Sequence, residues 1–182
     1  LQLSLRADVG DAPIVVAKRF FPHAMPPETL QWLDDALIDG RLRHGIAIFH
    51  GDPRDWPFET AGRFSAQADI DELRLRYQDD WPDGEALKGI ARFVNNGFDA
   101  DLSGRVGKVE IKRVYGGIER YAAPWLNLSI QAQGGGSALL DVLRRSPIGQ
   151  HHHDILDGLS IGGQGDVSLE LRVPLQKELG EL

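Results

Sequence analysis

The stretch Trp125-Leu126-Asn127-Leu128-Ser129-Ile130-Gln131-Ala132 alternates apolar and polar side chains almost without a break. Successive side chains of a β-strand point to opposite faces, so Leu126, Leu128 and Ile130 would share one face of a strand. A strand with one dry and one wet face is typical of an antiparallel sheet that packs on one side only. This stretch therefore predicts a half-buried strand in an antiparallel sheet.

The same alternation recurs along the chain, in LQLSLRA (1–7), DELRLRY (71–77), KVEIK (108–112) and DVSLELRV (166–173). Two short apolar runs, APIVVA (12–17) and HGIAIFH (44–50), predict more deeply buried strands. A slip of one residue would turn a whole strand to water, so the pattern fixes the packed face. We expect that face to carry Leu73, Leu75, Val109, Ile111, Leu126, Leu128, Val167, Leu169 and Leu171.

Three segments have helical periodicity instead. In 26–40, apolar residues recur at Leu30, Leu33 and Leu37; in 83–97, they recur at Leu87, Ile90, Ala91 and Val94. In 134–147, Ser137 could cap a helix, and Asp141 lies four residues before Arg145. The sequence thus predicts a single α+β domain over residues 1–182. Its twisted, mostly antiparallel sheet would have about six to seven strands covered by three short helices.

Composition excludes several functions. The 27 acidic and 20 basic residues give a net charge of -7, which argues against a general nucleic-acid binder. The absence of cysteine excludes disulfide scaffolds, thiol nucleophiles and cysteine-ligated metal clusters. No apolar run approaches the ~20 residues of a membrane span. The opening LQLSLRAD (1–8) does not resemble a signal peptide, so we expect a cytoplasmic protein, and we expect no membrane partner.

One stretch matches the residue pattern of a hydrolase motif but lacks the structural context of that motif. Gly158-Leu159-Ser160-Ile161-Gly162 matches the G-x-S-x-G elbow, which lies between a strand and a helix. Here HHHDILD precedes the motif and a strand-like segment follows it, with no histidine after His153. The sequence therefore predicts a turn in which Ser160 is not a nucleophile, and we expect that the chain is not an enzyme.

The histidines leave one enzymatic alternative open. His50 and Asp52 form a His-x-Asp pair that, with a distant histidine such as His151 or His153, matches the ligand types of a facial triad. Such a site would hold a divalent metal such as iron or zinc. Otherwise His50 and Asp52 belong to a turn, the histidines 151–153 form a solvated loop, and no cofactor is expected.

The leading hypothesis rests on two loops rich in aspartate, proline and tryptophan. Residues 69–85 carry seven acidic and two basic side chains. Tryptophan is enriched at interface hot spots, so these loops could anchor a basic protein partner. The predicted binding residues are Trp56, Asp79, Asp80, Trp81 and Asp83. The chain would then be a protein-binding or assembly module, such as an inhibitor, an adaptor or a subunit of a complex.

A weaker alternative is an RNA-binding subunit. The segment IGGQGD (161–166) resembles the glycine loop of RAMP-type RNA-binding proteins of CRISPR complexes, and GGGSALLDVLRR (134–145) is similar to the start of their helix. The resemblance covers a small part of the chain. It would imply an anion-binding face, for which the sequence offers Arg74, Arg76, Lys108 and Lys112.

Overall fold

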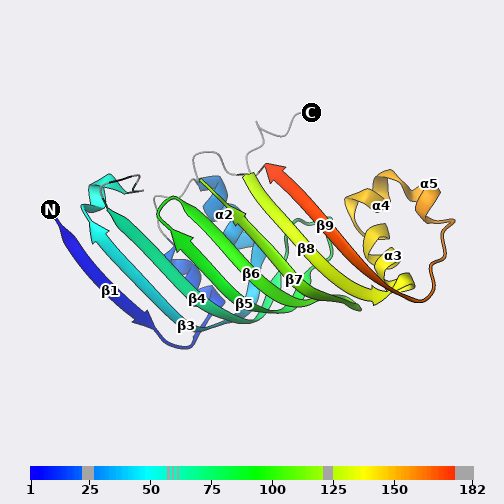
Figure 1. Ribbon diagram of the computed structural model, residues 1–182, viewed down its shortest axis with the longest axis horizontal. Helices are drawn as coiled ribbons and strands as arrows, with labels where there is room; N and C mark the ends of the chain where they lie inside the picture. The colour runs from blue at the N-terminus through cyan, green and yellow to red at the C-terminus, as the bar shows by residue number, and fades with distance from the viewer. Residues whose placement is uncertain (22–26, 57, 59, 61, 121–124, 175–182) are drawn as a thin grey trace.

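One open antiparallel sheet of nine strands dominates the protein (Figure 1). The computed structural model describes residues 1–182 except 22–26, 57, 59, 61, 121–124 and 175–182. The strand order is β1-β3-β4-β5-β6-β7-β8-β9, and β2 pairs with β3 beside β1. From β3 onward the sheet is a meander, because each strand pairs with the next one in the sequence.

The strands span 11 residues or more in several cases. Their bounds are β1 Leu3–Val9, β2 Ala12–Pro13, β3 Leu37–Gly51, β4 Arg63–Leu75, β5 Gly84–Val94, β6 Gly97–Val106, β7 Val109–Ile118, β8 Trp125–Gly135 and β9 Gln164–Pro174. The quoted stretch 125–132 lies in β8, which pairs with β9 over 11 consecutive residue pairs without a bulge. Its strict alternation is thus matched by an unbroken ladder.

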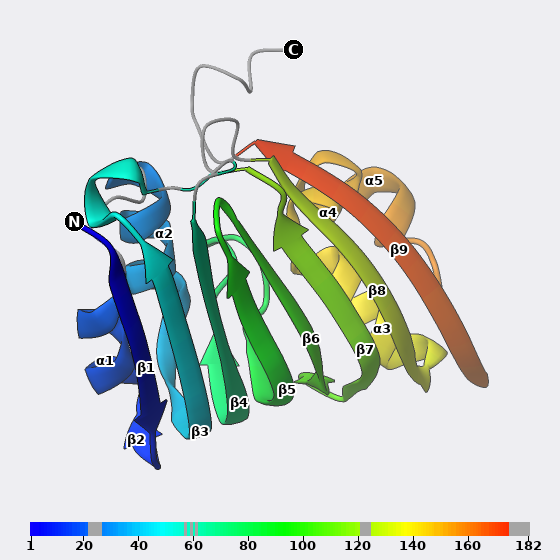
Figure 2. The ribbon, with the colours of Figure 1, turned by 60° about the vertical axis from the view of Figure 1, so that its left-hand side comes forward.

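Short helices lie on one side of this sheet in two groups (Figure 2). The helices are α1 Ile14–Ala17, α2 Pro27–Ala36, α3 Gly136–Arg144, α4 Pro147–His151 and α5 His153–Leu156, with single 3-10 turns at Lys18–Phe20 and Pro53–Asp55. Helices α1 and α2 form the first group. The other three follow β8 and lie beside β9, and α3 packs against the sheet there.

The core is the contact between these helices and the sheet. Ile14 of α1 packs with Ile70, Leu73, Leu87 and Leu102. Helix α2 packs through Leu33, and α3 packs through Ala138, Leu139 and Val142 against β7 and β8. These contacts remove apolar surface from water, which is the main force that holds helices on a sheet.

The predicted packed face is confirmed. Leu73, Val109, Ile111 and Leu126 are buried, and Leu75, Leu128, Leu169 and Leu171 are half-buried. Val167, on the last strand, is the exception at 41% exposed. Alternation therefore identified eight of the nine predicted inward residues correctly.

The predicted fold class is right only in part, because the protein is mostly β. The sheet has nine strands, not six to seven. The helix expected at 83–97 is strand β5, and APIVVA contains only the two-residue β2 before it turns into α1. Helix α2 ends at Ala36, so Leu37 and Ile38 open β3. Helix α3 is confirmed with its Asp141–Arg145 ion pair at 2.8 Å, but Gly135, not Ser137, is the N-cap.

Strand β5 was misread because its apolar residues satisfy both periods. Leu87, Ile90, Ala91 and Val94 suit a helix, yet Leu87, Ala91 and Phe93 also share one strand face. Tertiary pairing decides such cases. Val94 pairs directly with Gly97, so the chain reverses through a two-residue turn in which Asn95 has φ 46°. Asparagine adopts this left-handed conformation more readily than most residues.

Bulges keep the apolar side chains on one face. Ile70 and Leu73 lie three residues apart and would point to opposite sides of a regular strand, but a register shift falls between them. Similar shifts occur in β3, β5 and β7. Glu72 and Ala86 take positive φ angles of 53° and 48° at two of these positions. An extra residue in one strand also bends the sheet locally.

The bulge in β5 gives a stability prediction. Ala86 is exposed and left-handed, a conformation that costs a non-glycine residue ~1–2 kcal/mol, against ~0.5–1 kcal/mol for the greater chain entropy of glycine. Ala86→Gly should therefore stabilise the protein by about 0.5 kcal/mol. Ala91→Gly, in the regular part of β5, should destabilise it by about 1 kcal/mol. Urea unfolding of both variants checks this; equal destabilisation would contradict the bulge.

Candidate functional site

The helix-side face of the sheet is apolar from edge to edge. The cross-strand registers place side chains in rows that run across the strands. One row contains Ala7, Ala47, Ala66, Phe93, Phe98, Ile118, Leu126 and Val173. The next contains Val9, Gly45, Ala68, Ala91, Ala100, Gly116, Leu128 and Leu171. Neither row contains a polar side chain. We call this side the apolar face.

The opposite side, the wet face, carries the charges. Its arginines pair with carboxylates on the same or a neighbouring strand. Examples are Arg43–Asp71 at 2.8 Å, Arg92–Asp99 at 2.6 Å, Arg113–Asp101 at 2.6 Å and Arg105–Glu85 at 3.0 Å. The Arg113 guanidinium donates two hydrogen bonds to Asp101 and holds the pKa of that carboxyl below its ordinary value. These paired charges make the wet face compatible with contact with water.

The helices cover the apolar face unevenly. Over the middle strands, Leu73, Leu87, Leu102 and Ile118 are buried beneath them. Along the edge strand β1, however, Leu3, Leu5 and Val9 remain 39%, 55% and 42% exposed. Figure 2 shows β1 at the sheet margin, and the apolar face continues from the covered core to this open strip. A surface of this kind can accept an apolar ligand.

Both predicted tryptophan anchors pack at the rim of the core. The Trp56 ring meets Phe64 edge-on at 6.1 Å between centroids, and the Trp81 ring meets Tyr77 edge-on at 6.4 Å. Each tryptophan is half-buried, whereas Asp79 and Asp80 are exposed. That these residues form a binding surface stays a prediction. In the structure, each tryptophan ring packs against a neighbouring aromatic ring.

Asp83 is occupied within the protein. Its carboxylate lies 2.7 Å from Arg74 and 3.2 Å from Arg76, and it is 14% exposed. Partial burial raises the pKa of Asp83, but hydrogen bonds from Arg76 and Arg74 outweigh that effect and hold the pKa below its ordinary value. The same pairs neutralise two of the four residues predicted to bind an anion. Lys112 pairs with Glu110 at 2.7 Å, and Lys108 is exposed in the turn after β6.

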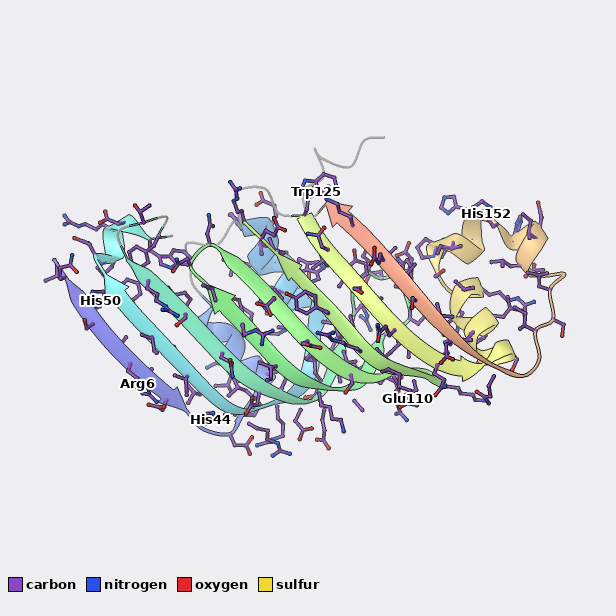
Figure 3. The ribbon with its side chains drawn as sticks, viewed as in Figure 1. Arg6, His44, His50, Glu110, Trp125 and His152 are labelled. Carbon is purple, nitrogen blue, oxygen red and sulfur yellow. The ribbon has the colours of Figure 1, made fainter. Side chains whose placement is uncertain are left out.

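The structure does not bring the predicted metal ligands together. His50 hydrogen-bonds Ser4 at 2.8 Å, and Asp52 accepts hydrogen bonds from Arg54. His151 bonds the Pro147 carbonyl in α4, and His153 lies 3.2 Å from Asp154 in α5. His50 and the histidine-bearing helices stand at opposite ends of the sheet (Figure 3). Within the described residues, no group of three or more potential metal ligands forms. The solvated loop expected at 151–153 is instead a pair of short helices.

Comparison with known proteins decides the family. The family model described as YhdP protein matches residues 2–181. The chain belongs to the YhdP family. A relative in Escherichia coli (strain K12), named intermembrane phospholipid transporter YhdP, is 24% identical over 166 residues. These residues are 90% of this chain and 13% of that protein. No solved structure matches the chain.

Membership of the YhdP family overturns the leading hypothesis from the sequence. The name of the relative assigns it to phospholipids and to transport between membranes, not to recognition of a basic protein. The predictions of a protein-binding module, of a basic protein partner, of no membrane partner and of a cytoplasmic location are therefore wrong. The metal-dependent enzyme and RNA-binding alternatives are not supported either, because neither the description of the family nor the name of the relative refers to such an activity.

The physical reason for the error is the interpretation of the acidic residues. Three of the seven acidic residues of 69–85 are not free to bind a positive partner, because they form ion pairs with arginines of the same protein: Asp71, Asp83 and Glu85. Sequence reasoning also missed that the apolar face is continuous. The signal was present in FSAQADI (64–70) and FDADL (98–102), where apolar residues alternate with polar or charged ones. No helix in the described part of the chain is long and apolar enough to cross a membrane.

The clamp on Asp83 makes a pH prediction. Because the folded-state pKa of Asp83 is depressed, its ion pairs add stability above the unfolded pKa near ~4, and this contribution disappears as the pH falls through the folded-state pKa. Asp83→Asn should cost about 1 kcal/mol at pH 7 and clearly less at about pH 3, which lies below the unfolded pKa. Asp79→Asn, at an exposed neighbour, should cost little at either pH. Thermal unfolding at both pH values measures this; a cost that does not depend on pH would contradict the clamp.

Proposed function

We propose that the apolar face of this sheet holds the acyl chains of phospholipids and forms part of a path along which they move between membranes. The observation that carries the proposal is the separation of the two faces. Rows of apolar side chains cross the sheet on one side, and paired charges occupy the other. The relationship to an intermembrane phospholipid transporter supports the choice of ligand.

The physical basis is the hydrophobic effect. An acyl chain lying on apolar side chains leaves water at a gain of roughly 0.8 kcal/mol for each buried CH₂ group. Polar lipid headgroups gain nothing from this face, because its rows offer them no hydrogen-bonding side chain. A phospholipid would thus lie with its chains on the sheet and its headgroup in solvent. The chain spans 13% of the relative's length, so it would form one segment of such a path.

The open strip along β1 offers a test that spares the core. Leu5 and Ile48 are exposed apolar residues on paired strands, at 55% and 40%, but they lie on opposite faces. Leu5→Asp places a charge on the apolar face, where a lipid chain could not compensate for it. We expect photo-crosslinking to a phospholipid with a reactive acyl chain to drop about fivefold.

Ile48→Asp is the matched control. It introduces the same charge on the wet face, beside Arg6, and should leave crosslinking unchanged. Circular dichroism establishes that both variants are folded. Equal loss in both variants, or no loss in Leu5→Asp, would refute the assignment of lipid to the apolar face.

A further inference from the structure

Two buried hydroxyl groups have no hydrogen-bond partner among the described residues. They are Oγ1 of Thr29 and the phenol oxygen of Tyr77. Thr29 is completely buried, and the oxygen of Tyr77 is buried although its ring reaches the surface. Leaving a buried hydroxyl without a partner costs about 1–3 kcal/mol, so a structure rarely retains one. Here both belong to the contact between α2 and the neighbouring segments.

Thr29 faces the sheet. It lies one helical turn before Leu33 and two turns before Ala36, and these three residues are the buried stripe of α2. Leu33 packs against Ile118 and Leu126 on the apolar face. The hydroxyl of Thr29 is therefore enclosed on the side of α2 that covers the proposed lipid path.

Tyr77 belongs to the same cluster. Its side chain packs against the group formed by Leu33, Ile118 and Leu126, and its ring meets the Trp32 ring edge-on at 6.3 Å. The indole nitrogen of Trp32 donates a hydrogen bond to the Tyr77 carbonyl oxygen at 3.1 Å, which fixes Tyr77 against α2. Burial raises the pKa of Tyr77 to about 12, so its hydroxyl keeps its proton at neutral pH and can donate it.

The surroundings of the two hydroxyls favour a ligand with an uncharged hydrogen-bond acceptor. Both groups can donate a hydrogen bond, and the side chains of the surrounding cluster are aliphatic or aromatic: Phe21, Leu30, Trp32, Phe93, Phe98 and Leu128. A phosphate would lose its hydration among these apolar side chains, which is unfavourable. A carbonyl oxygen attached to an acyl chain fits both the donors and the apolar surroundings.

We propose that Thr29 and Tyr77 form a polar subsite for the ester carbonyls of a glycerolipid whose acyl chains lie on the apolar face. This inference rests on the proposed function and adds to it a specific recognition of the ester linkage. Both hydroxyls are enclosed, so a carbonyl could reach them only if the start of α2 lifts from the sheet. The other end is held by the Ala36 carbonyl, which accepts a hydrogen bond from the Arg76 backbone at 2.8 Å, and by the direct continuation of α2 into β3.

The experiment compares two phospholipids that differ only in their linkages. Ester-linked and ether-linked phosphatidylethanolamine with the same saturated chains are titrated into the protein, and dissociation constants are measured by displacement of a fluorescent fatty-acyl probe. The parent protein should bind the ester lipid about tenfold more tightly, as expected for two modest hydrogen bonds. Thr29→Val and Tyr77→Phe should each reduce this preference about threefold, and the double variant should abolish it.

The control variants are Thr60→Val and Tyr115→Phe, which make the same changes at exposed positions and should keep the full preference. The lipid-free protein supplies a readout independent of lipid. Because Val and Phe remove unpartnered hydroxyls, the melting temperature of Thr29→Val and Tyr77→Phe should stay the same or rise. A fall in both would mean that protein or water satisfies these hydroxyls, and it would overturn the proposal.

The remaining outcomes separate the two proposals. If the parent protein binds both lipids equally, the ester subsite is wrong while the lipid path stands. If it binds neither lipid, the proposed function falls and the subsite with it. Palmitate tests the other source of an acyl carbonyl. Hydroxyl-dependent binding of palmitate, without a preference between the two phospholipids, would also overturn the assignment to a glycerolipid.

Discussion

The antiparallel register is the constraint on which the rest of this protein depends. Side chains alternate along each strand, so a register that aligns one apolar pair aligns a whole row across the sheet. A slip of a single residue would bring the wet-face carboxylates against the helices. The bulges in β3, β4, β5 and β7 serve the same constraint, because each restores the phase where the sequence would otherwise lose it. The sheet can therefore remain open and one-sided over nine strands.

One-sidedness couples stability to function. The surface that would hold an acyl chain is the same surface on which the helices pack, so any area covered by a helix is withdrawn from a ligand. Helices α1, α2 and α3 bury the middle of the face through Ile14, Leu33 and Leu139, while Leu5 on β1 stays open. The paired charges opposite keep the other side in water without creating a strong field, because most arginines there have a carboxylate partner nearby. Geometry thus restricts an apolar ligand to one side.

The sequence predicted correctly those strands in which the local alternation of apolar and polar residues agrees with the pairing to neighbouring strands. In β8 and β9, Leu126, Leu128, Leu169 and Leu171 alternate regularly and pair without a bulge, so local pattern and tertiary register coincide. Strand β5 failed because its residues fit two periods and only pairing with β4 and β6 decides between them. The candidate site could not be found from the sequence, since the open strip depends on where the helices settle. Asp83 is a second example. The sequence shows its charge, but it does not show that Arg74 and Arg76, which were predicted to bind an anion, form ion pairs with it.

The two hydroxyls under α2 show why such a surface need not be uniformly apolar. Valine at position 29 and phenylalanine at position 77 would fill the same space without an unpartnered group, so the present residues make the lipid-free state less stable than it could be. A transport path has a corresponding requirement, because a lipid held too tightly at one segment would stop moving. In the proposed subsite, hydrogen bonds of modest strength that form only when α2 lifts would recover part of this cost in the bound state and would keep the net affinity low. Helix α2 packs through Leu33 on Ile118 and Leu126, the same side chains on which a lipid would lie. The unpartnered hydroxyls would therefore both weaken the packing of α2 and provide the donors that recognise the lipid.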